Sequence, residues 1–114
     1  MELKTTRCEP CHKGSEPVSA QAAEHHLEQL PEWRIQTTHD EKRLTRTFPF
    51  KRYQSCLDFA QAIGALAEEE NHHPLMEVAW GAVTVSWWTH SIGGLHLNDF
   101  IMAARTDALF ERGF

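Results

Sequence analysis

One long helical pattern lies between two pairs of strand-like patterns, and this order limits the folds open to the chain. Between about residues 53 and 70, apolar side chains recur with the 3.6-residue period of a helix. They form one stripe, made of Cys56, Phe59, Ala60, Ile63, Leu66 and Ala67. A helix with one apolar stripe needs an apolar surface to pack on, and a sheet supplies such a surface.

The first pair of strand-like runs precedes this helix. Trp33, Ile35 and Thr37 alternate with polar residues, and the polar stretch 39–42 follows. The next run places Leu44, Arg46, Phe48 and Phe50 on one face, with Thr45 and Thr47 on the other. Two alternating runs joined by a short polar segment predict an antiparallel hairpin.

The second pair follows the helix, and Pro74 prevents the helix from continuing into it. Met76, Val78 and Trp80 alternate with Glu77 and Ala79, Gly81 fits a turn, and Val83, Val85 and Trp87 alternate with Thr84, Ser86 and Trp88. This pattern predicts a second hairpin.

Two further helices complete the pattern. Ser19 is a suitable N-cap for a helix that carries Ala20, Ala23, Leu27 and Leu30 and that Pro31 ends. Leu97, Phe100, Ile101, Ala104 and Ala108 indicate a last helix. The order α-β-β-α-β-β-α predicts an α+β fold, in which helices cover one face of a four-stranded antiparallel sheet.

The chain length fits a single domain, since 114 residues can bury a core of their own. Residues 1–17 carry no apolar period, so we expect a flexible N-terminal tail over 1–17 and one domain over 18–114.

Composition argues against several classes of partner. A net charge of −5 gives no basic surface for a nucleic acid or an anionic membrane. No apolar run approaches the roughly 20 residues of a membrane-spanning helix, and Met1 to Thr6 lack the apolar stretch of a signal peptide. Three cysteines, an odd number, fit poorly with a set of disulfides. We therefore expect a cytoplasmic protein.

The eight histidines are the main candidates for chemistry. His25 and His26 lie between glutamates and read as a solvated helix face. His72 and His73 lie where a helix gives way to a strand, where side chains converge on pockets. His90 follows the last strand pattern, and Asp99 lies just inside the last helix. On spacing alone, structural roles stay open: a histidine can interact with a helix C-terminus, and Asp99 can cap its own helix.

At these positions the sequence resembles the pterin-4a-carbinolamine dehydratase family. Glu68-Glu69-Glu70-Asn71-His72-His73-Pro74 is similar to the family signature E-x-x-x-H-H-P, and Thr89-His90 is similar to its T-H element. The segment from Gly94 to Asp99 matches its G-L-x-x-x-D pattern, and Trp33 matches a tryptophan that opens the first strand. The resemblance spans about residues 19 to 112. It differs at His96, where the family often has Ser or Thr to cap the last helix.

The resemblance implies a four-stranded antiparallel sheet with three helices on one face, and a homodimer or homotetramer. It implies that His72, His73 and His90 surround a pterin, with Asp99 orienting a histidine and Glu68 in support. It also implies substrate contacts from Pro74, Thr89 and Ser91. No metal and no cofactor are expected.

The implied reaction is the dehydration of a 4a-hydroxytetrahydropterin, such as 4a-hydroxytetrahydrobiopterin, to a quinonoid dihydropterin. This step recycles tetrahydrobiopterin, with a possible pathway link to an aromatic amino acid hydroxylase. One group must take the N5 proton and another must protonate the departing hydroxyl. Histidine suits both roles because its ordinary pKa is about 6.5. We assign His73 as base and His72 and His90 as candidate acids.

Two alternatives remain at this level. Three histidines and Asp99 could ligate zinc, and Cys8-x-x-Cys11-His12 matches a haem-attachment pattern or half of a zinc site. The other alternative is a binding module, either a dimerisation partner for a transcription factor or a relative linked to molybdopterin metabolism. Metal analysis and a dehydratase assay separate these from the enzyme.

Overall fold

The computed structural model describes residues 1–9 and 15–114, and it has the predicted α+β architecture. The helices are α1 (Ala20–Leu27), α2 (Tyr53–Glu70) and α3 (Leu97–Glu111), and the strands are β1 (Arg34–Thr38), β2 (Glu41–Pro49), β3 (Leu75–Ala79) and β4 (Ala82–Trp87). Two short 3-10 helices, η1 (Leu3–Thr5) and η2 (His90–Ile92), complete the elements. The order α-β-β-α-β-β-α is therefore confirmed.

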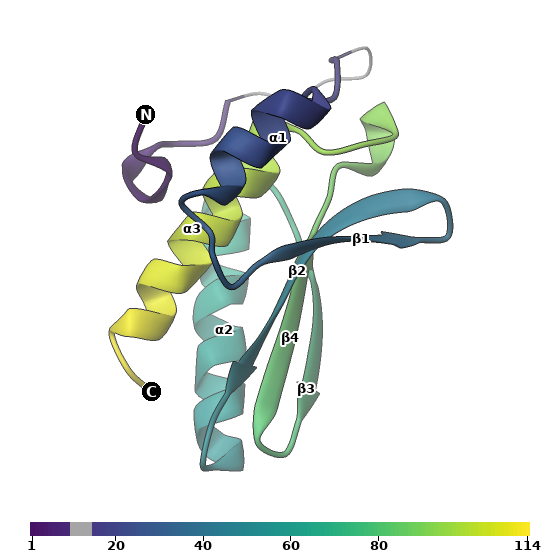
Figure 1. The fold of residues 1–114 in the computed structure, drawn as a ribbon. Helices are drawn as coiled ribbons and strands as arrows, with labels where there is room; N and C mark the ends of the chain where they lie inside the picture. Colours follow the sequence, from purple (N-terminus) through teal and green to yellow (C-terminus); the bar gives the residue numbers. More distant parts are fainter. Residues whose placement is uncertain (10–14) are drawn as a thin grey trace.

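The four strands form one antiparallel sheet in the order β1-β2-β4-β3, so the two hairpins join through β2 and β4. Figure 1 shows the three helices on the same side of this twisted sheet. α1 lies over the start of α3, where the rings of His26 and Phe100 are 5.2 Å apart. His26 is thus not on a solvated face, and its partial burial lowers its pKa.

Both hairpin turns differ in their bounds from the sequence pattern: the first is shorter than predicted, and the second includes one residue predicted to lie in a strand. His39 and Asp40 form the first turn with φ values of 50° and 63°, as in a two-residue turn of type I′. Glu41 and Lys42, predicted to lie in the connection, therefore belong to β2. In the second hairpin the strand ends at Ala79, so Trp80 lies in the turn and is 76% exposed.

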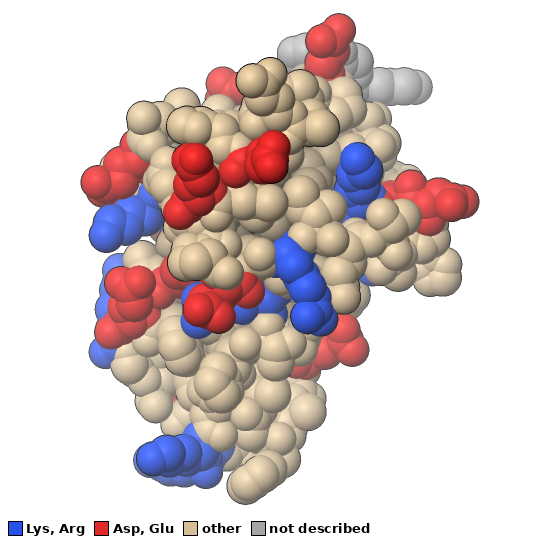
Figure 2. All heavy atoms as spheres, viewed as in Figure 1, with Lys and Arg blue, Asp and Glu red and all other residues tan. Residues whose placement is uncertain are grey.

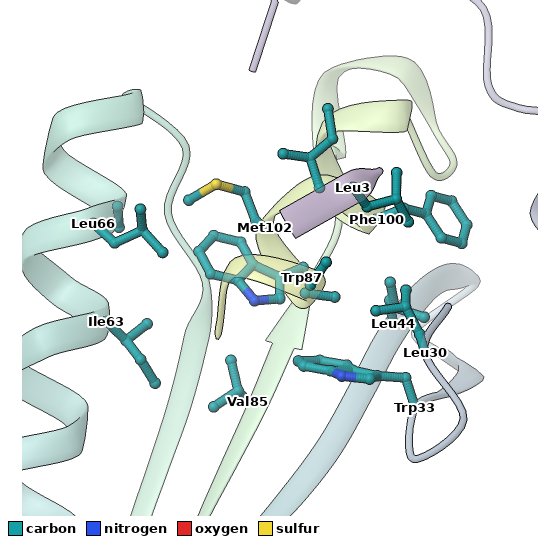
Figure 3. Close-up of a cluster of buried hydrophobic side chains, with 14 of the residues drawn as sticks. Leu3, Leu30, Trp33, Leu44, Ile63, Leu66, Val85, Trp87, Phe100 and Met102 are labelled. Atoms are coloured by element: carbon teal, nitrogen blue, oxygen red, sulfur yellow. The ribbon is translucent and has the colours of Figure 1, made fainter. Parts of the chain in front are cut away.

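The core fills the space between the sheet and the helices. Trp87 of β4 is fully buried, and Figure 3 shows Ile63 and Leu66 of α2 facing its ring. The indole N–H of Trp87 donates to Thr106 of α3 at 3.2 Å. A fully buried aromatic at the centre of the sheet therefore ties both long helices to β4.

The segment predicted as a tail differs from the structure at its first residues. Leu3 is fully buried in the core cluster, and its backbone N–H donates to Gln29 at 3.0 Å. A lone apolar residue has no period, so the pattern 1–17 gave no sign of this contact. Just after this segment, the Val18 N–H donates to the Leu95 carbonyl at 2.8 Å. The chain is therefore held against the domain at Leu3 and again at Val18.

The helices and the surface charges of the described residues show two further features. Of the helices in the described part of the chain, none is both long and apolar enough to cross a bilayer. Among the described residues on the face seen in Figure 2, acidic and basic side chains are interspersed and do not gather into one basic region.

Candidate active site

The sheet topology brings the signature residues to one end of the sheet. Leu75 of β3 pairs with Ser86 of β4, so the residues just before β3 and just after β4 are neighbours. Asn71 ends α2 in the left-handed conformation, with φ of 52°, and the His72 N–H returns to the Ala67 carbonyl at 3.1 Å. This helix end directs the chain from α2 into β3 and places His72 beside the end of β4.

Asp99 connects three segments at this end of the sheet. Its carboxylate is fully buried and accepts a hydrogen bond from His72 Nε2 at 2.6 Å. It also accepts from the Thr89 hydroxyl and from the His96 backbone N–H, both at 2.9 Å. A buried carboxylate needs such a set of donors, since an unpaired charge in the interior is very costly.

The start of α3 is well formed although His96 replaces the hydroxyl residue. The Asn98 N–H donates to His96 Nδ1 at 3.0 Å, while the Asp99 side chain accepts from the His96 N–H. This reciprocal pattern is that of a capping box, with imidazole in the place of a hydroxyl. The capping role that was one alternative for Asp99 is therefore real, and it coexists with the contact to His72.

The contact with Asp99 fixes the tautomer of His72. An ionised carboxylate can only accept, so Nε2 of His72 carries the proton, and Nδ1 has no hydrogen-bond partner among the described residues. The ring also stacks on Trp87, with centroids 5.6 Å apart and planes 16° apart. Two contacts therefore orient an imidazole whose side chain is only 13% exposed.

The other two predicted histidines are more exposed and have separate partners. His73 Nε2 lies 3.3 Å from Glu68, and its side chain is 54% exposed. His90 Nδ1 contacts Glu41 of β2, and its side chain is 86% exposed. This hydrogen bond is the main cause that lowers the pKa of Glu41. The described chain thus brings His72, Thr89 and Asp99 into direct contact, whereas His73 pairs with Glu68 and His90 pairs with Glu41.

A cavity of about 490 Å³ opens beside His72. Its size falls within the usual range for small-molecule sites, roughly 300–1,000 Å³. Predicted site residues His72, Thr89 and Ser91 line it, and His73, Pro74 and His90 do not. The other lining residues are Arg7, Cys8, Glu9, Glu69, Glu70, Asn71 and Asn98.

Sequence reasoning missed the part of this cavity that comes from the N-terminal segment. The Glu70 side chain, 2% exposed, accepts from Arg7 Nε at 2.8 Å and from the Cys8 N–H at 2.9 Å. The Arg7 hydrogen bond is the main cause that lowers the pKa of Glu70. Burial, followed by the charge of Glu70, raises the pKa of Cys8 to about 12. The Cys8 thiol is therefore protonated at neutral pH.

The metal alternatives can be compared with the described residues only. Within 1–9 and 15–114, no group of three or more His, Cys, Asp or Glu side chains is arranged to hold a metal ion. Of the motif Cys8-x-x-Cys11-His12, only Cys8 belongs to that range, and Cys11 and His12 lie outside the described residues.

Comparison with known sequences identifies a matching family. The model of the family described as "Pterin 4 alpha carbinolamine dehydratase" matches residues 16–109. A protein of Chlorobium luteolum named "Putative pterin-4-alpha-carbinolamine dehydratase" is 46% identical over 110 residues, covering 96% of each chain. A protein of Syntrophotalea carbinolica with the same name is 48% identical over 109 residues, covering 96% of this chain and 97% of the relative.

Two solved structures resemble this fold. A transcriptional coactivator/pterin dehydratase from Brucella melitensis superposes with a TM-score of 0.73 at 28% identity, over 82% of this chain and 98% of that one. A pterin dehydratase-like protein, described as a RuBisCO assembly factor in the alpha-carboxysome, superposes with a TM-score of 0.58 at 28% identity. That match covers 68% of this chain and 88% of the other.

Proposed function

This chain belongs to the pterin-4a-carbinolamine dehydratase family, and on that premise we propose that it is a hydro-lyase that removes water from a 4a-hydroxytetrahydropterin. The observation that carries this proposal is the His72 ring, held between Asp99 and Trp87 at the wall of the cavity. An oriented imidazole with one free nitrogen is suited to proton transfer at neutral pH.

The reaction balances without an electron donor or acceptor. The C4a–O bond breaks, the N5–H bond gives up its proton, and a C4a=N5 double bond forms. The departing hydroxide takes a proton and leaves as water. The protein therefore has to catalyse only two proton transfers, and for this reason no cofactor is proposed.

Asp99 makes His72 suitable for either step. With Nε2 donating to the carboxylate, Nδ1 can accept a proton when the ring is neutral and donate one when it is charged. The buried carboxylate stabilises the charged ring, as an orienting acid does beside a catalytic histidine. We keep His73 as the proposed base and His72 and His90 as proposed acids. Glu68 and Glu41 contact His73 and His90 respectively and would act as their supporting carboxylates.

Substitution of each histidine tests these roles. The rate of dehydration of a 4a-hydroxytetrahydropterin would be followed by stopped flow after subtraction of the uncatalysed reaction. His72→Ala, His73→Ala and His90→Ala should each lower kcat, by roughly 10²-fold or more for an essential proton-transfer group. Binding should weaken much less, because His72→Ala removes one of several lining side chains and His73 and His90 do not line the cavity.

His25→Ala is the matched control, since His25 is exposed on α1 and 73% of its side chain is accessible. A folded His72→Ala variant that behaves like His25→Ala would contradict the proposed site. The same comparison made with His73→Ala and His90→Ala shows which of the three rings participates. Thermal unfolding of every variant separates a loss of chemistry from a loss of structure.

We also propose that the chain assembles as a homodimer or homotetramer. β1 and β3 are edge strands, and unpaired edges favour pairing with another chain. Leu75 on β3 and Tyr53 and Leu57 on α2 are large apolar residues with 40% or more of their surface exposed. Contact between copies would cover these positions.

The natural setting proposed is recycling of tetrahydrobiopterin in the cytoplasm, next to an aromatic amino acid hydroxylase. The alternative is a binding role, for a transcription factor or in molybdopterin metabolism. The Brucella melitensis protein supports considering it, because that protein is described as both a transcriptional coactivator and a pterin dehydratase. A folded chain that binds no pterin and accelerates no dehydration would favour the binding role.

A further inference from the structure

The N-terminal residues Arg7, Cys8 and Glu9, which we call the strap, form one wall of the cavity beside His72. The family match begins only at residue 16, so the strap lies outside the matched domain. It still contributes three of the residues that line the cavity. A segment outside the domain thus helps to define the space available to a ligand.

The first attachment of the strap is to Glu70 at the end of α2. Arg7 donates to both carboxylate oxygens of Glu70, at 3.0 and 2.8 Å from Nε, and the Cys8 N–H donates at 2.9 Å. Arg105 of α3 lies 2.9 Å from the same carboxylate. A nearly buried charge with several donors holds its partners firmly, because releasing one leaves the charge poorly compensated.

The second attachment is to Asn98 in the first turn of α3. The Glu9 N–H donates to Asn98 Oδ1 at 3.0 Å, and Asn98 Nδ2 donates to the Glu9 carbonyl at 2.7 Å. The amide thus satisfies both backbone groups of one strap residue, as a neighbouring strand would. Asn98 is 3% exposed whereas Glu9 is exposed, so this pair of hydrogen bonds is partly buried.

Both attachments lie next to His72 and Asp99, the hydrogen-bonded pair at the wall of the cavity. Asn98 precedes Asp99, and Glu70 lies two residues before His72. Upstream, the fully buried Leu3 anchors the segment in the core. The strap is therefore fixed relative to the His72 ring, and Cys8 lies between its two attachments.

Resting on the dehydratase function proposed above, we propose that the strap is a wall of the pterin-binding site and that Cys8 limits the size of the pterin substituent that lies against it. Cys8 is half-buried, small and uncharged, so it leaves room that a larger side chain would fill. The wall acts on binding and not on the proton transfers, since His72 and Asp99 lie on other segments.

Protection of the Cys8 thiol tests whether the wall contacts a ligand. Cys11→Ser would serve as the background, so that Cys8 and the fully buried Cys56 are the remaining cysteines. Alkylation of Cys8 would be followed over hours at pH 8.5 by mass spectrometry, because its raised pKa makes the thiol react slowly. It would be measured with and without 7,8-dihydropterin, whose Kd is first determined by calorimetry. At ten times its Kd the ligand should slow the reaction about tenfold, in proportion to the free protein.

A size substitution tests the limit itself. Cys8→Phe should raise KM and leave kcat unchanged at saturation. The increase in KM should be larger for 4a-hydroxytetrahydropterins that carry bulky C6 substituents than for the 6-methyl compound. Gln21→Phe, on the exposed side of α1 and outside the cavity, is the matched control.

The outcomes separate this inference from the proposed function. Normal dehydration combined with equal Cys8 reactivity with and without bound dihydropterin would refute the proposal that the strap lines the pterin-binding site. The proposed dehydratase function would be unaffected. Absence of both pterin binding and dehydration would overturn both. If Cys8→Phe does not fold, the protection experiment still decides, because it uses the native side chain at position 8.

Discussion

Replacing Asp99 with Asn changes one of the three hydrogen bonds of this buried side chain and keeps the size and shape of the side chain. An asparagine oxygen in the position of Oδ2 still accepts from Thr89 and from the His96 N–H. The amide NH₂ then faces His72 Nε2, where the carboxylate accepted at 2.6 Å. Two donors cannot bond to each other, so the His72 ring must move its proton to Nδ1.

The size of the effect follows from the lost interaction. A hydrogen bond to a charged group contributes about 1.5–3 kcal/mol, and this is the stabilisation that the charged His72 ring loses. At 1.36 kcal/mol for each factor of ten, Asp99→Asn should lower kcat about 10- to 150-fold. The free energy of unfolding should fall by no more than about 3 kcal/mol, because two of the three bonds remain.

Stopped-flow dehydration and nitrogen NMR of the His72 ring measure the two consequences. We expect the Nε2–H tautomer in the native protein and the Nδ1–H tautomer in the variant. Asp58→Asn, an exposed aspartate bonded to Gln54, controls for the change of charge. If Asp99→Asn kept the native rate with its tautomer reversed, the reasoning that assigns Nδ1 to catalysis would be refuted.

Three further predictions concern the N-terminal segment and assembly. Leu3→Ala should lower the free energy of unfolding by about 2–5 kcal/mol in urea titrations, because it empties a fully buried site, whereas the exposed Lys4→Ala should change it by less than about 0.5 kcal/mol. The pKa of Glu70 is depressed in the folded state, so its stabilisation is present above its ordinary value of 4.5 and is lost as the pH falls through the folded value. Glu70→Gln should therefore weaken the loss of stability between neutral and acidic pH, and a variant with the native pH dependence would contradict the assigned contact. Sedimentation equilibrium at micromolar concentration should show a species heavier than the 13.1 kDa monomer, and a lone monomer would exclude the proposed assembly.

The element types could be predicted because each is encoded by a period that spans several residues. The stripe of α2 and the alternation of β2 and β4 both depend on burial against one surface, which the structure shows. Element ends depend instead on turn geometry. Glu41 and Trp80 were misplaced because a two-residue turn brings one into a strand and leaves the other outside.

The candidate site could be predicted in part. His72, Thr89 and Asp99 were identified from the resemblance, and they are in direct contact. Cys8 and Asn98 could not be brought to this site from the sequence, because their contacts join positions far apart in the chain and follow no period. His96 shows a similar limit, since an imidazole in the capping position is recognisable only from its bond to the Asn98 N–H.

The wide separation of the site residues along the chain has a consequence for protein synthesis. The contacts of Asp99 span 27 residues to His72 and 10 residues to Thr89, and the Glu9–Asn98 pair spans 89. A nascent chain that has completed both hairpins still lacks the carboxylate that orients His72. On the proposed function, activity would begin only after α3 has emerged from the ribosome and docked, so the onset of activity would report complete folding of this domain.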